Sequence, residues 1–380
     1  GTNGMVSKEM TNHVSVNLIS GYSGGLDGFE LSGFSGHLKN NMKGLQLAGF
    51  SNSVLGEGDG AQIAGFSNFN KQHFAGFQLA GFSNVVKSNA DAAQFAGFSN
   101  VVVGSVSGPQ ISGFMNVATE NSGITQIAGF SNMAQAESKG VQLSGFMNYS
   151  NGNHAGQISG FTNVNHGKLS GAQISGFASV NSGRIDGAQI SGFFNYAGKL
   201  NGLQLGVFNY ADSIGVGVPV GVFSYVKNGY RAFEFSSNET LYGVTTFKSG
   251  VSSFYTLVSV GLSPKKDMLM WGFGYGIGTI IETSEKTNLS IEGMTYHINE
   301  DEWFTNRVNF LNKLQFTESF ELNERFSVFG GLSWNVVIAD IRDNNGNPVK
   351  SAISPWTVWE RVYRDTEVEM YPGFSLGFRF

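Results

Sequence analysis

The chain of 380 residues contains no cysteine and only six prolines, and charged residues make up 13% of it. Without cysteine, disulfide bonds, thiolate metal ligands and a cysteine nucleophile are excluded. A net charge of -5 with no basic cluster argues against nucleic acid as a partner. No apolar run reaches the roughly 18 residues that a transmembrane helix needs. No secretory leader pattern stands at the start, so we expect either that the protein is not exported or that a leader preceding Gly1 has been removed.

Glycine and phenylalanine are abundant, with 53 and 33 copies, and together they mark a repeat. Phrases such as "GLQLAGFSN" return every 16 residues, occasionally every 15. The phenylalanines of this motif are Phe34, Phe50, Phe66, Phe82, Phe98, Phe114, Phe130, Phe146, Phe161, Phe177 and Phe193, and Phe208 and Phe223 continue the series. Four positions earlier stand the glutamines Gln46, Gln62, Gln78, Gln94, Gln110, Gln126, Gln142, Gln157, Gln173, Gln189 and Gln204. The asparagines that usually follow by two positions are Asn52, Asn68, Asn84, Asn100, Asn116, Asn132, Asn148, Asn163, Asn195 and Asn209.

Sixteen residues hold two short strands and two turns, and the many glycines and turn-forming residues oppose helix. In a parallel β-solenoid each residue lies on its own copy about 4.8 Å away. Glutamines and asparagines would then form hydrogen-bonded ladders of side-chain amides. We therefore predict a solenoid of thirteen coils, roughly 60 Å long. An antiparallel meander with one hairpin per repeat is the alternative. The variable halves of the repeats carry most of the charges and are predicted to be solvent-facing turns.

Beyond about Gly229 the composition changes, and all five tryptophans lie there. In "MLMWGFGYGIGTI" bulky residues alternate with glycine, and in "GFSLGFRF" the apolar residues Phe374, Leu376, Phe378 and Phe380 alternate with small or charged ones. Such alternation is typical of strands with lipid on one side and a polar lumen on the other. It predicts an eight-stranded antiparallel transmembrane β-barrel, with its interior filled by side chains. The expected strands are 229–237, 240–249, 252–262, 267–281, 287–298, 304–320, 325–339 and 367–380.

Five charged residues of these strands are candidates for a buried network inside the barrel: Glu234, Glu292, Arg307, Lys313 and Arg379. Placement at a water-exposed rim is the alternative for some of them. Short turns at "KSGV", "ETSEKT" and "ELNE" are predicted to be periplasmic, and the long loop 341–366 extracellular. This orientation also puts the repeat domain on the periplasmic side, whereas a passenger exported through a barrel would lie outside.

The repeats "G-x-Q-[IL]-[AS]-G-F-x-N", the start "NLISGYSGGLDGFELSGF" and the segments "GYRAFEFSSNETLY" and "WGFGYGIGT" cover nearly the whole chain. In these residues the protein resembles the surface-repeat outer-membrane proteins of Gram-negative, Bacteroidota-type bacteria. The terminal "GFRF" is similar to the signal by which the barrel-insertion machinery recognises its clients, here Phe378 and Phe380. The resemblance implies location and architecture, and no reaction. Autotransporters share the domain order, but their twelve-stranded barrel and plugging helix are not seen in this sequence.

Carbohydrate-active β-helix enzymes need clustered carboxylates. The acidic residues of the repeats are scattered over turns without a recurring position: Asp91, Glu120, Glu137, Asp186 and Asp212. The six histidines show no paired metal-ligand spacing, so no metal and no cofactor are predicted. The amide ladders could instead offer a flat face to glycan or extended peptide. Trp303, Trp356 and Trp359 could stack on sugars or form an interfacial aromatic belt.

The sequence thus predicts an all-β protein with a cap at 1–30, a repeat β-solenoid at 31–228 and an outer-membrane barrel at 229–380. The expected function is non-enzymatic: the barrel anchors a scaffold or binding surface in a cell-envelope assembly. Expected partners are outer-membrane lipid and envelope proteins, with glycan as a further candidate. A surface adhesin or glycan-capture protein is the alternative, and a carbohydrate-active enzyme the third hypothesis.

Overall fold

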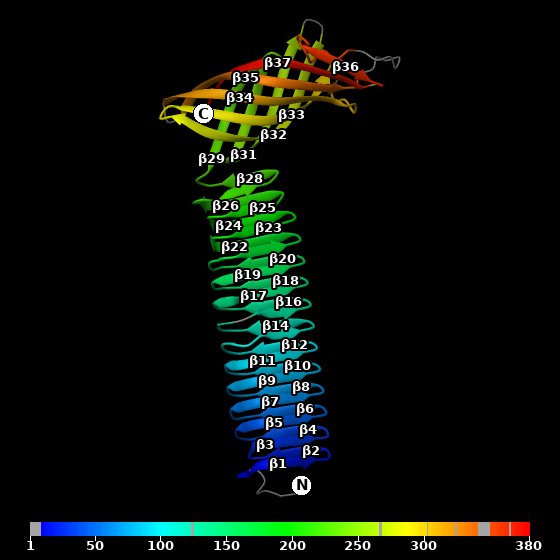
Figure 1. Ribbon diagram of the computed structural model, residues 1–380, viewed down its shortest axis with the longest axis vertical. Coiled ribbons are helices and arrows are strands. Elements are labelled where there is room, and N and C mark those ends of the chain that lie inside the picture. The colour runs from blue at the N-terminus through cyan, green and yellow to red at the C-terminus, as the bar shows by residue number, and fades with distance from the viewer. Residues whose placement is uncertain are drawn as a thin grey trace. The chain divides into compact units, whose positions relative to one another are not determined.

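The computed structural model describes residues 9–121, 123, 125–265, 268–301, 303–323, 325–340, 350–364 and 366–380 (Figure 1). These residues form strands β1 to β37 and contain no α-helix. They divide into two compact units. The first unit comprises Gly1–Val207 and Gly215–Gly217, and the second comprises Phe208–Ile214 and Val218–Phe380.

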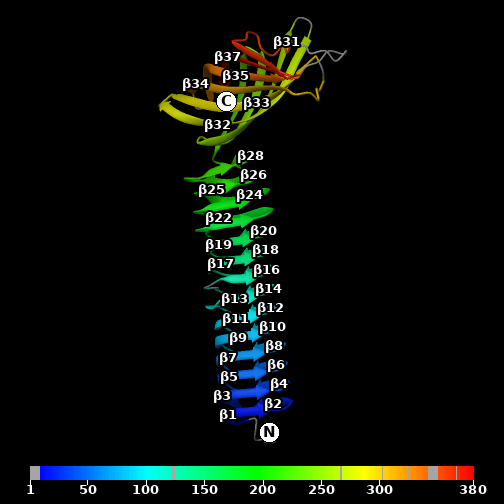
Figure 2. The same ribbon diagram turned by 45° about the vertical axis from the view of Figure 1, so that its right-hand side comes forward.

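The first unit is a β-solenoid, in which two stacks of short strands run along the length of the coil (Figures 1 and 2). The first stack contains β1 (Thr11–Asn17), β3 (Gly25–Ser32), β5 (Met42–Ala48), β7 (Gly58–Ala64), β9 (Phe74–Ala80), β11 (Ala90–Ala96), β13 (Gln110–Ser112), β15 (Gln126–Ala128), β17 (Ser138–Ser144), β19 (His154–Ser159), β21 (Ala172–Ser175), β23 (Ala188–Ser191) and β25 (Leu203–Leu205). The second stack contains β2 (Ser20–Ser23), β4 (Ser35–Leu38), β6 (Ser51–Val54), β8 (Ser67–Asn70), β10 (Ser83–Val86), β12 (Ser99–Val102), β14 (Met115–Ala118), β16 (Ser131–Ala134), β18 (Met147–Ser150), β20 (Thr162–Asn165), β22 (Ala178–Ile185) and β24 (Phe194–Leu200).

Neighbouring strands of each stack are parallel and one repeat apart in the chain. Gln46 of β5 lies opposite Gln62 of β7, and Asn52 of β6 lies opposite Asn68 of β8. The parallel solenoid is therefore confirmed, and the antiparallel meander is wrong. The glycine before each phenylalanine is required by this stacking: a Cβ on Gly65 would collide with the carbonyl oxygen of Gly49 one coil earlier.

The interior of the solenoid is filled by columns of residues that compensate for one another in size. Gly58 lies opposite Phe74, whose ring occupies the space that a Cβ on Gly58 would need. From Leu26 to Ala118 an apolar cluster lines this interior. Further along the chain the same columns hold polar residues, among them Ser138 and His154. After them the column is apolar again, with Leu169, Ile185 and Leu200 fully buried, so the polar core residues form a local segment of the solenoid.

Both ends of the repeat region differ in detail from the sequence-based picture. The described part of the predicted cap at 1–30 forms β1, β2 and most of β3, and β1 pairs in parallel with β3, so these residues continue the two stacks. At the other end, Phe208 and Phe223 begin the paired strands β26 and β28. The phenylalanines from Phe50 to Phe193 instead precede a strand, in the turn. Phe208 and Phe223 therefore stand one position later, relative to the following strand, than the earlier phenylalanines, because "GVF" has replaced "GF-x" at this corner.

The second unit contains a nine-stranded antiparallel sheet with the order β29-β30-β31-β32-β33-β34-β35-β37-β36, and β29 also pairs with β37. Its strands are β29 (Tyr230–Asn238), β30 (Gly243–Val251), β31 (Phe254–Lys265), β32 (Met268–Ser284), β33 (Thr287–Glu300), β34 (Asn309–Asn323), β35 (Phe326–Ala339), β36 (Trp359–Tyr363) and β37 (Thr366–Arg379). The short strands β26 (Phe208–Ile214), β27 (Val218–Val220) and β28 (Phe223–Val226) belong to the same unit.

Eight of these nine strands lie where the alternating pattern predicts them. The ninth, β36, falls inside the predicted long loop and pairs with β37 from Trp359 to Tyr363. β34 begins at Asn309, five residues later than expected. The division between the units also precedes the predicted boundary at 229, because residues near 224 contact the sheet. The Ser249 hydroxyl donates to the Ser224 carbonyl at 2.7 Å, and the Tyr275 hydroxyl donates to the Val222 carbonyl at 3.0 Å.

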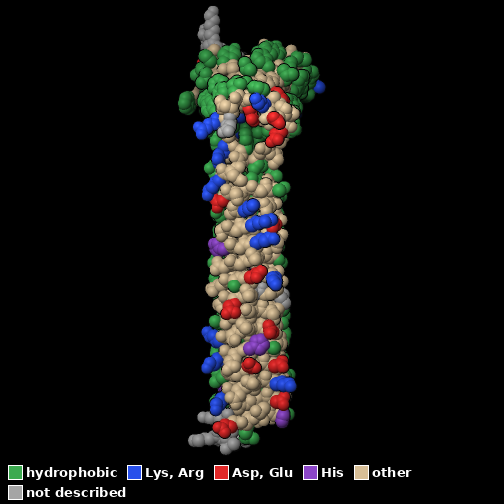
Figure 3. Space-filling model, turned by 90° about the vertical axis from the view of Figure 1, so that its left-hand side faces the viewer, with side chains coloured by type: hydrophobic (Ala, Val, Ile, Leu, Met, Phe, Trp, Pro, Cys, Tyr) green, Lys and Arg blue, Asp and Glu red, His purple; other side chains and the backbone are tan. Residues whose placement is uncertain are grey.

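The two faces of this sheet have opposite character. On β32, Leu269, Phe273 and Ile277 are exposed, whereas Met270 is fully buried. On β37, the side chains predicted to share an outer face are all exposed: Phe374, Leu376, Phe378 and Phe380. Hydrophobic side chains cover much of the second unit's visible surface in Figure 3, where the visible face of the first unit carries dispersed charges.

Candidate functional site

The glutamines of the repeat lie inside the solenoid and form one continuous ladder. All eleven are at most 1% exposed. Each side-chain amide donates to the glutamine one coil earlier, as Gln62 Nε2 does to Gln46 Oε1 at 2.9 Å and Gln110 to Gln94 at 2.9 Å. The ladder ends at Glu30, which occupies the glutamine position of its coil and accepts from Gln46 at 3.5 Å. Burial raises the pKa of the Glu30 carboxyl.

The asparagines form a second buried ladder with the opposite direction. Asn52 Nδ2 donates forward to Asn68 Oδ1 at 2.9 Å, and the same nitrogen donates to the backbone carbonyl of Ile63 at 2.9 Å. This pattern repeats up to Asn148, which donates to Asn163 at 2.9 Å. Asn163 faces Ser179 in the next coil. The ladder therefore joins each coil to the next through both the side chain and the backbone.

These positions rule out the interpretation of the amides as an exposed glycan-binding face. The asparagines of the repeat are at most 2% exposed. Neither the glutamine nor the asparagine amides can therefore contact a ligand outside the solenoid. Burial of an amide is tolerated only when its hydrogen bonds are made within the protein. The ladders are thus internal supports of the coil.

The phenylalanines of the repeat form the most regular surface feature, which we call the aromatic stripe. It consists of Phe34, Phe50, Phe66, Phe82, Phe98, Phe114, Phe130, Phe146, Phe161, Phe177 and Phe193. Successive rings stack with centroids 4.8–5.2 Å apart and interplanar angles of 1–11°. Each ring remains 37–51% exposed. The phenylalanines of the motif therefore lie outside and its polar amides inside.

In the second unit, a buried ionic cluster connects four strands. Lys248 of β30 pairs with Glu234 of β29 at 2.7 Å and with Glu292 of β33. Arg379 of β37 pairs with Glu234 at 2.5 Å. Tyr255 donates to Glu292 at 2.6 Å. The sequence predicted three of these charges and missed Lys248, although its alternation with Thr246 and Val244 on the inner side of β30 carried the signal.

The other two candidates for this network lie elsewhere. Lys313 is buried and pairs with Glu239 at 3.4 Å, which makes a separate ion pair. Arg307 is exposed, so its placement inside the sheet was wrong. The reason is the late start of β34: Arg307 precedes the strand whose alternation would have turned it inward.

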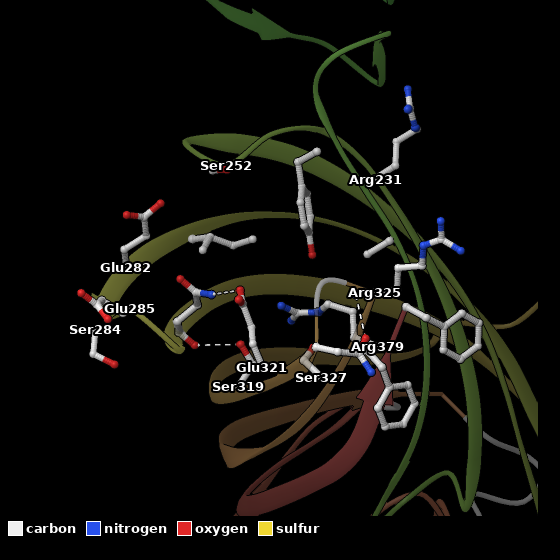
Figure 4. A pocket seen from close by; sticks show the side chains of 17 residues that line it. Arg231, Ser252, Glu282, Ser284, Glu285, Ser319, Glu321, Arg325, Ser327 and Arg379 are labelled. Atoms are coloured by element: carbon white, nitrogen blue, oxygen red, sulfur yellow. Dashed lines mark hydrogen bonds between the residues drawn. The ribbon is translucent and has the colours of Figure 1, made fainter.

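A polar pocket of about 690 Å³ lies at the end of the second unit's sheet that carries the three short turns. Figure 4 shows its acidic side chains, Glu282, Glu285 and Glu321, on one side and the arginines on the other. The arginines are Arg231, Arg325 and Arg379. Arg379 joins this pocket to the buried ionic cluster through Glu234. The pocket is charged on both sides and has no single sign with which to select a ligand.

The acidic residues of the repeats are paired individually. Asp91 accepts from the Ser107 hydroxyl at 2.6 Å, and Glu120 from the Ser105 hydroxyl at 3.1 Å. Asp186 accepts from Asn201, Lys168 and Arg184, which hold the pKa of its carboxyl below the usual range. Asp212 pairs with Lys227 at 2.5 Å.

One surface cavity of about 300 Å³ is lined by Asp91 and Glu137 together with Lys139. Asp91 and Glu137 belong to coils three steps apart, so about 14 Å of coil rise separates them. A glycosidase needs its two carboxyl groups about 5 to 9.5 Å apart. The cavity therefore does not match the geometry of the carbohydrate-active hypothesis.

The described residues include one group of carboxylates close enough to share an ion: Glu360, Glu367 and Glu369. Lys350 already bridges two of them, at 2.7 Å from Glu360 and 2.7 Å from Glu369. This lysine also holds the pKa of the Glu360 carboxyl below its ordinary value. The ammonium group supplies the positive charge that a metal would otherwise provide.

The remaining aromatic candidates lie on the surface of the second unit. Phe378 and Phe380 are half-exposed and pack around Phe235, with ring centroids 5.9 and 5.5 Å away. Trp303 is 89% exposed and lies 5.8 Å from the Trp271 ring. Trp356 and Trp359 are also exposed.

Comparison with known proteins gives no family: no family model matches the chain, and neither curated proteins nor solved structures yield a match. Among the described residues, no helix has the length and apolar character needed to cross a membrane.

Proposed function

We propose that the protein is a non-enzymatic outer-membrane protein of a Gram-negative bacterium. The sheet of the second unit closes through β29 and β37 into an eight-stranded barrel, which anchors the chain in lipid. The solenoid then serves as a scaffold or binding surface for other proteins of the cell envelope. With the short turns on the periplasmic side, the solenoid also lies in the periplasm.

The observation that carries this proposal is the reversed polarity of the second unit. Its outer face exposes bulky apolar residues along β32 and β37, while Glu234, Lys248 and Glu292 are buried on the inner face. A water-soluble sheet would bury the apolar residues and expose the charged ones. Lipid on the outside favours the arrangement that is observed. The pairing of β29 with β37 over Glu234–Asn238 leaves neither strand as an open edge there, which a spanning sheet requires.

A charged substitution on the outer face tests the anchor. Leu376→Arg on β37 should cost about 2–4 kcal/mol of unfolding free energy in lipid vesicles, because arginine is expensive on a lipid face. Val14→Arg on β1 is the matched control: Val14 is 72% and Leu376 67% exposed, and both are apolar. The control should change the free energy by less than about 0.5 kcal/mol, as surface substitutions usually do.

Urea unfolding followed by tryptophan fluorescence measures this difference, since all five tryptophans lie in the second unit. Equal effects of the two substitutions would contradict the anchor, as would a monodisperse protein in detergent-free buffer. Protease digestion of intact cells tests the sidedness: protection of the solenoid supports a periplasmic location, and cleavage favours a surface adhesin. Affinity purification from native membranes would then identify the envelope partners.

A further inference from the structure

The aromatic stripe is an unusually long apolar surface for a solenoid whose interior is already filled. Eleven rings at roughly 40% exposure, each with about 200 Å² of side-chain surface, present about 900 Å² to the outside. Monomeric proteins rarely expose contiguous apolar patches above about 300–600 Å². A standard protein interface needs about 800 Å² from each partner. The stripe alone reaches that size.

The surroundings of the stripe are also free of charge. From Phe50 to Phe193, the residues from five before each ring to three after it include no Asp, Glu, Lys or Arg. The outward residue three positions before each ring is Leu, Ile or Phe, and several of these are themselves exposed: Leu79, Leu143, Ile158 and Ile174. The charged side chains of the repeats lie in the variable halves instead, in turns or near the start of a first-stack strand, as Lys43 and Asp59 do. A partner for the stripe must therefore be apolar along its whole length.

The spacing of the rings restricts the partner further. Their centroids recur at 4.8–5.2 Å over ten successive steps. An α-helix has a pitch of about 5.4 Å and loses register within a few turns. A second solenoid of the same repeat has the same period and the same number of rings. Identical side chains at one spacing interdigitate into a dry interface, as in paired β-sheets.

We propose that the aromatic stripe is a self-association surface, through which two copies of this chain pair along their solenoids. The stripe is used by both copies, so the contact is two-fold symmetric and closes as a dimer. This inference rests on the first unit alone and does not depend on the proposed membrane anchor.

Cross-linking of single cysteine variants tests the proposal, because the natural chain contains no cysteine. Met115→Cys places a thiol beside Phe114, the central ring of the stripe. The central coil meets its own copy whether the two solenoids run parallel or antiparallel, provided the two stripes align end to end. Glu120→Cys in the variable turn of the same coil is the control, since Glu120 is exposed away from the stripe.

The purified full-length chain, in buffer or in lipid vesicles, is treated with a short bifunctional maleimide. Met115→Cys should give a covalent dimer of twice the 40.8 kDa chain mass, at least ten times more than Glu120→Cys. Equal cross-linking of both variants would indicate random collision and overturn the proposal. No dimer from Met115→Cys would overturn it too, and so would transfer of its cross-link to a different protein when cell envelopes are used.

A second variant removes rings of the stripe, and a separate measurement checks that it still folds. Phe98→Ser and Phe130→Ser, introduced into the Met115→Cys chain, remove two rings beside the reporter and should reduce the covalent dimer at least tenfold. Far-UV circular dichroism of the same sample shows whether the solenoid is retained. Native mass spectrometry of the unsubstituted chain provides the remaining check: a strictly monomeric protein at micromolar concentration contradicts the inference.

Discussion

Both units of the molecule bury polar side chains, yet they stabilise them in different ways. The solenoid pairs neutral amides with copies of themselves: Gln110, for example, donates to Gln94 and accepts from Gln126. The second unit pairs opposite charges that occur once each, as Lys248 does with Glu234 and Glu292. A ladder gains its stability from repetition, whereas an ionic cluster depends on every member.

The difference also concerns the outer surfaces. The solenoid leaves phenylalanine half-exposed in a single stripe, while the second unit exposes apolar side chains over a whole face of its sheet. A stripe suits a narrow contact with another chain, and a broad face suits a surrounding solvent such as lipid. We therefore expect different surroundings for the two units, and each of the following changes acts on one of them.

The largest effect is expected for Lys248→Met in the second unit. It leaves Glu234 and Glu292 buried, with Arg379 as the one remaining cation of the cluster among the described residues, and breaking a buried ion pair costs about 3–5 kcal/mol. The midpoint of urea unfolding by tryptophan fluorescence should fall accordingly. Lys286→Met in an exposed turn is the control, and Lys248→Met combined with Glu292→Gln should recover part of the loss. An unchanged midpoint would show that the cluster is not the stabilising element of this unit.

Gln110→Leu should have a smaller and local effect in the solenoid. The substitution leaves the Gln94 acceptor and the Gln126 donor unpaired inside the coil, at about 1–3 kcal/mol each. In repeat proteins a repeat mainly affects the stability of its direct neighbours. Hydrogen exchange should therefore accelerate in residues 90–130 and stay unchanged in residues 30–60. Gln135→Leu, at an exposed turn position, should leave both regions unchanged. A uniform acceleration along the solenoid would contradict this picture of independent neighbours.

Repetition explains which features could be predicted from the sequence. Gln46 and Asn52 recur with fixed spacing, so parallel stacking and amide ladders follow from the requirement that like residues lie on one another. Which side of the coil they face is different: hydropathy would place Phe50 inside and Gln46 outside, and the structure has the reverse. At this corner of the coil, buried alanines such as Ala64 and the ladder amides fill the interior, and the phenylalanine rings stack outside it.

In the second unit, alternation predicted the two faces but not the contacts between distant strands. Lys248 belongs to the ionic cluster through strands far apart in sequence, and no local pattern relates it to Glu292. The prediction for Arg307 was wrong because the bounds of β34 are set by pairing with β33 and β35, which residue type alone does not determine. An alternating pattern thus predicts which way a side chain points only for residues that lie within a strand.

The pH dependence of the solenoid should vary along its length, and His154 has the larger effect. Burial lowers the pKa of the His154 imidazole to about 4, while Gly156 donates its backbone N–H to Nδ1. The folded pKa is below the ordinary 6.5, so the folded coil binds fewer protons, and stability is lost as pH falls from about 6.5 toward 4. At pH 5 the loss should be about 2 kcal/mol. Hydrogen exchange near residues 138–170 at pH 7 and pH 5 measures it, and His154→Leu should abolish the difference.

The smallest change concerns Glu30, and its sign is opposite. Burial raises the pKa of this carboxyl, so the folded state favours the protonated form and stability falls as pH rises from the ordinary glutamate value through the raised one. Glu30→Gln supplies the neutral amide that the ladder carries elsewhere and should stabilise the first coils at pH 7 by about 1 kcal/mol, the net value of one amide hydrogen bond. Slower hydrogen exchange near residues 26–48 at pH 7 would be the readout, with Glu57→Gln in an exposed turn as the control. If the variant instead loosens these coils, the carboxylate is preferred there for its acceptor bonds from Asn17 and Ser32, and the solenoid would share the dependence on charge that distinguishes the second unit.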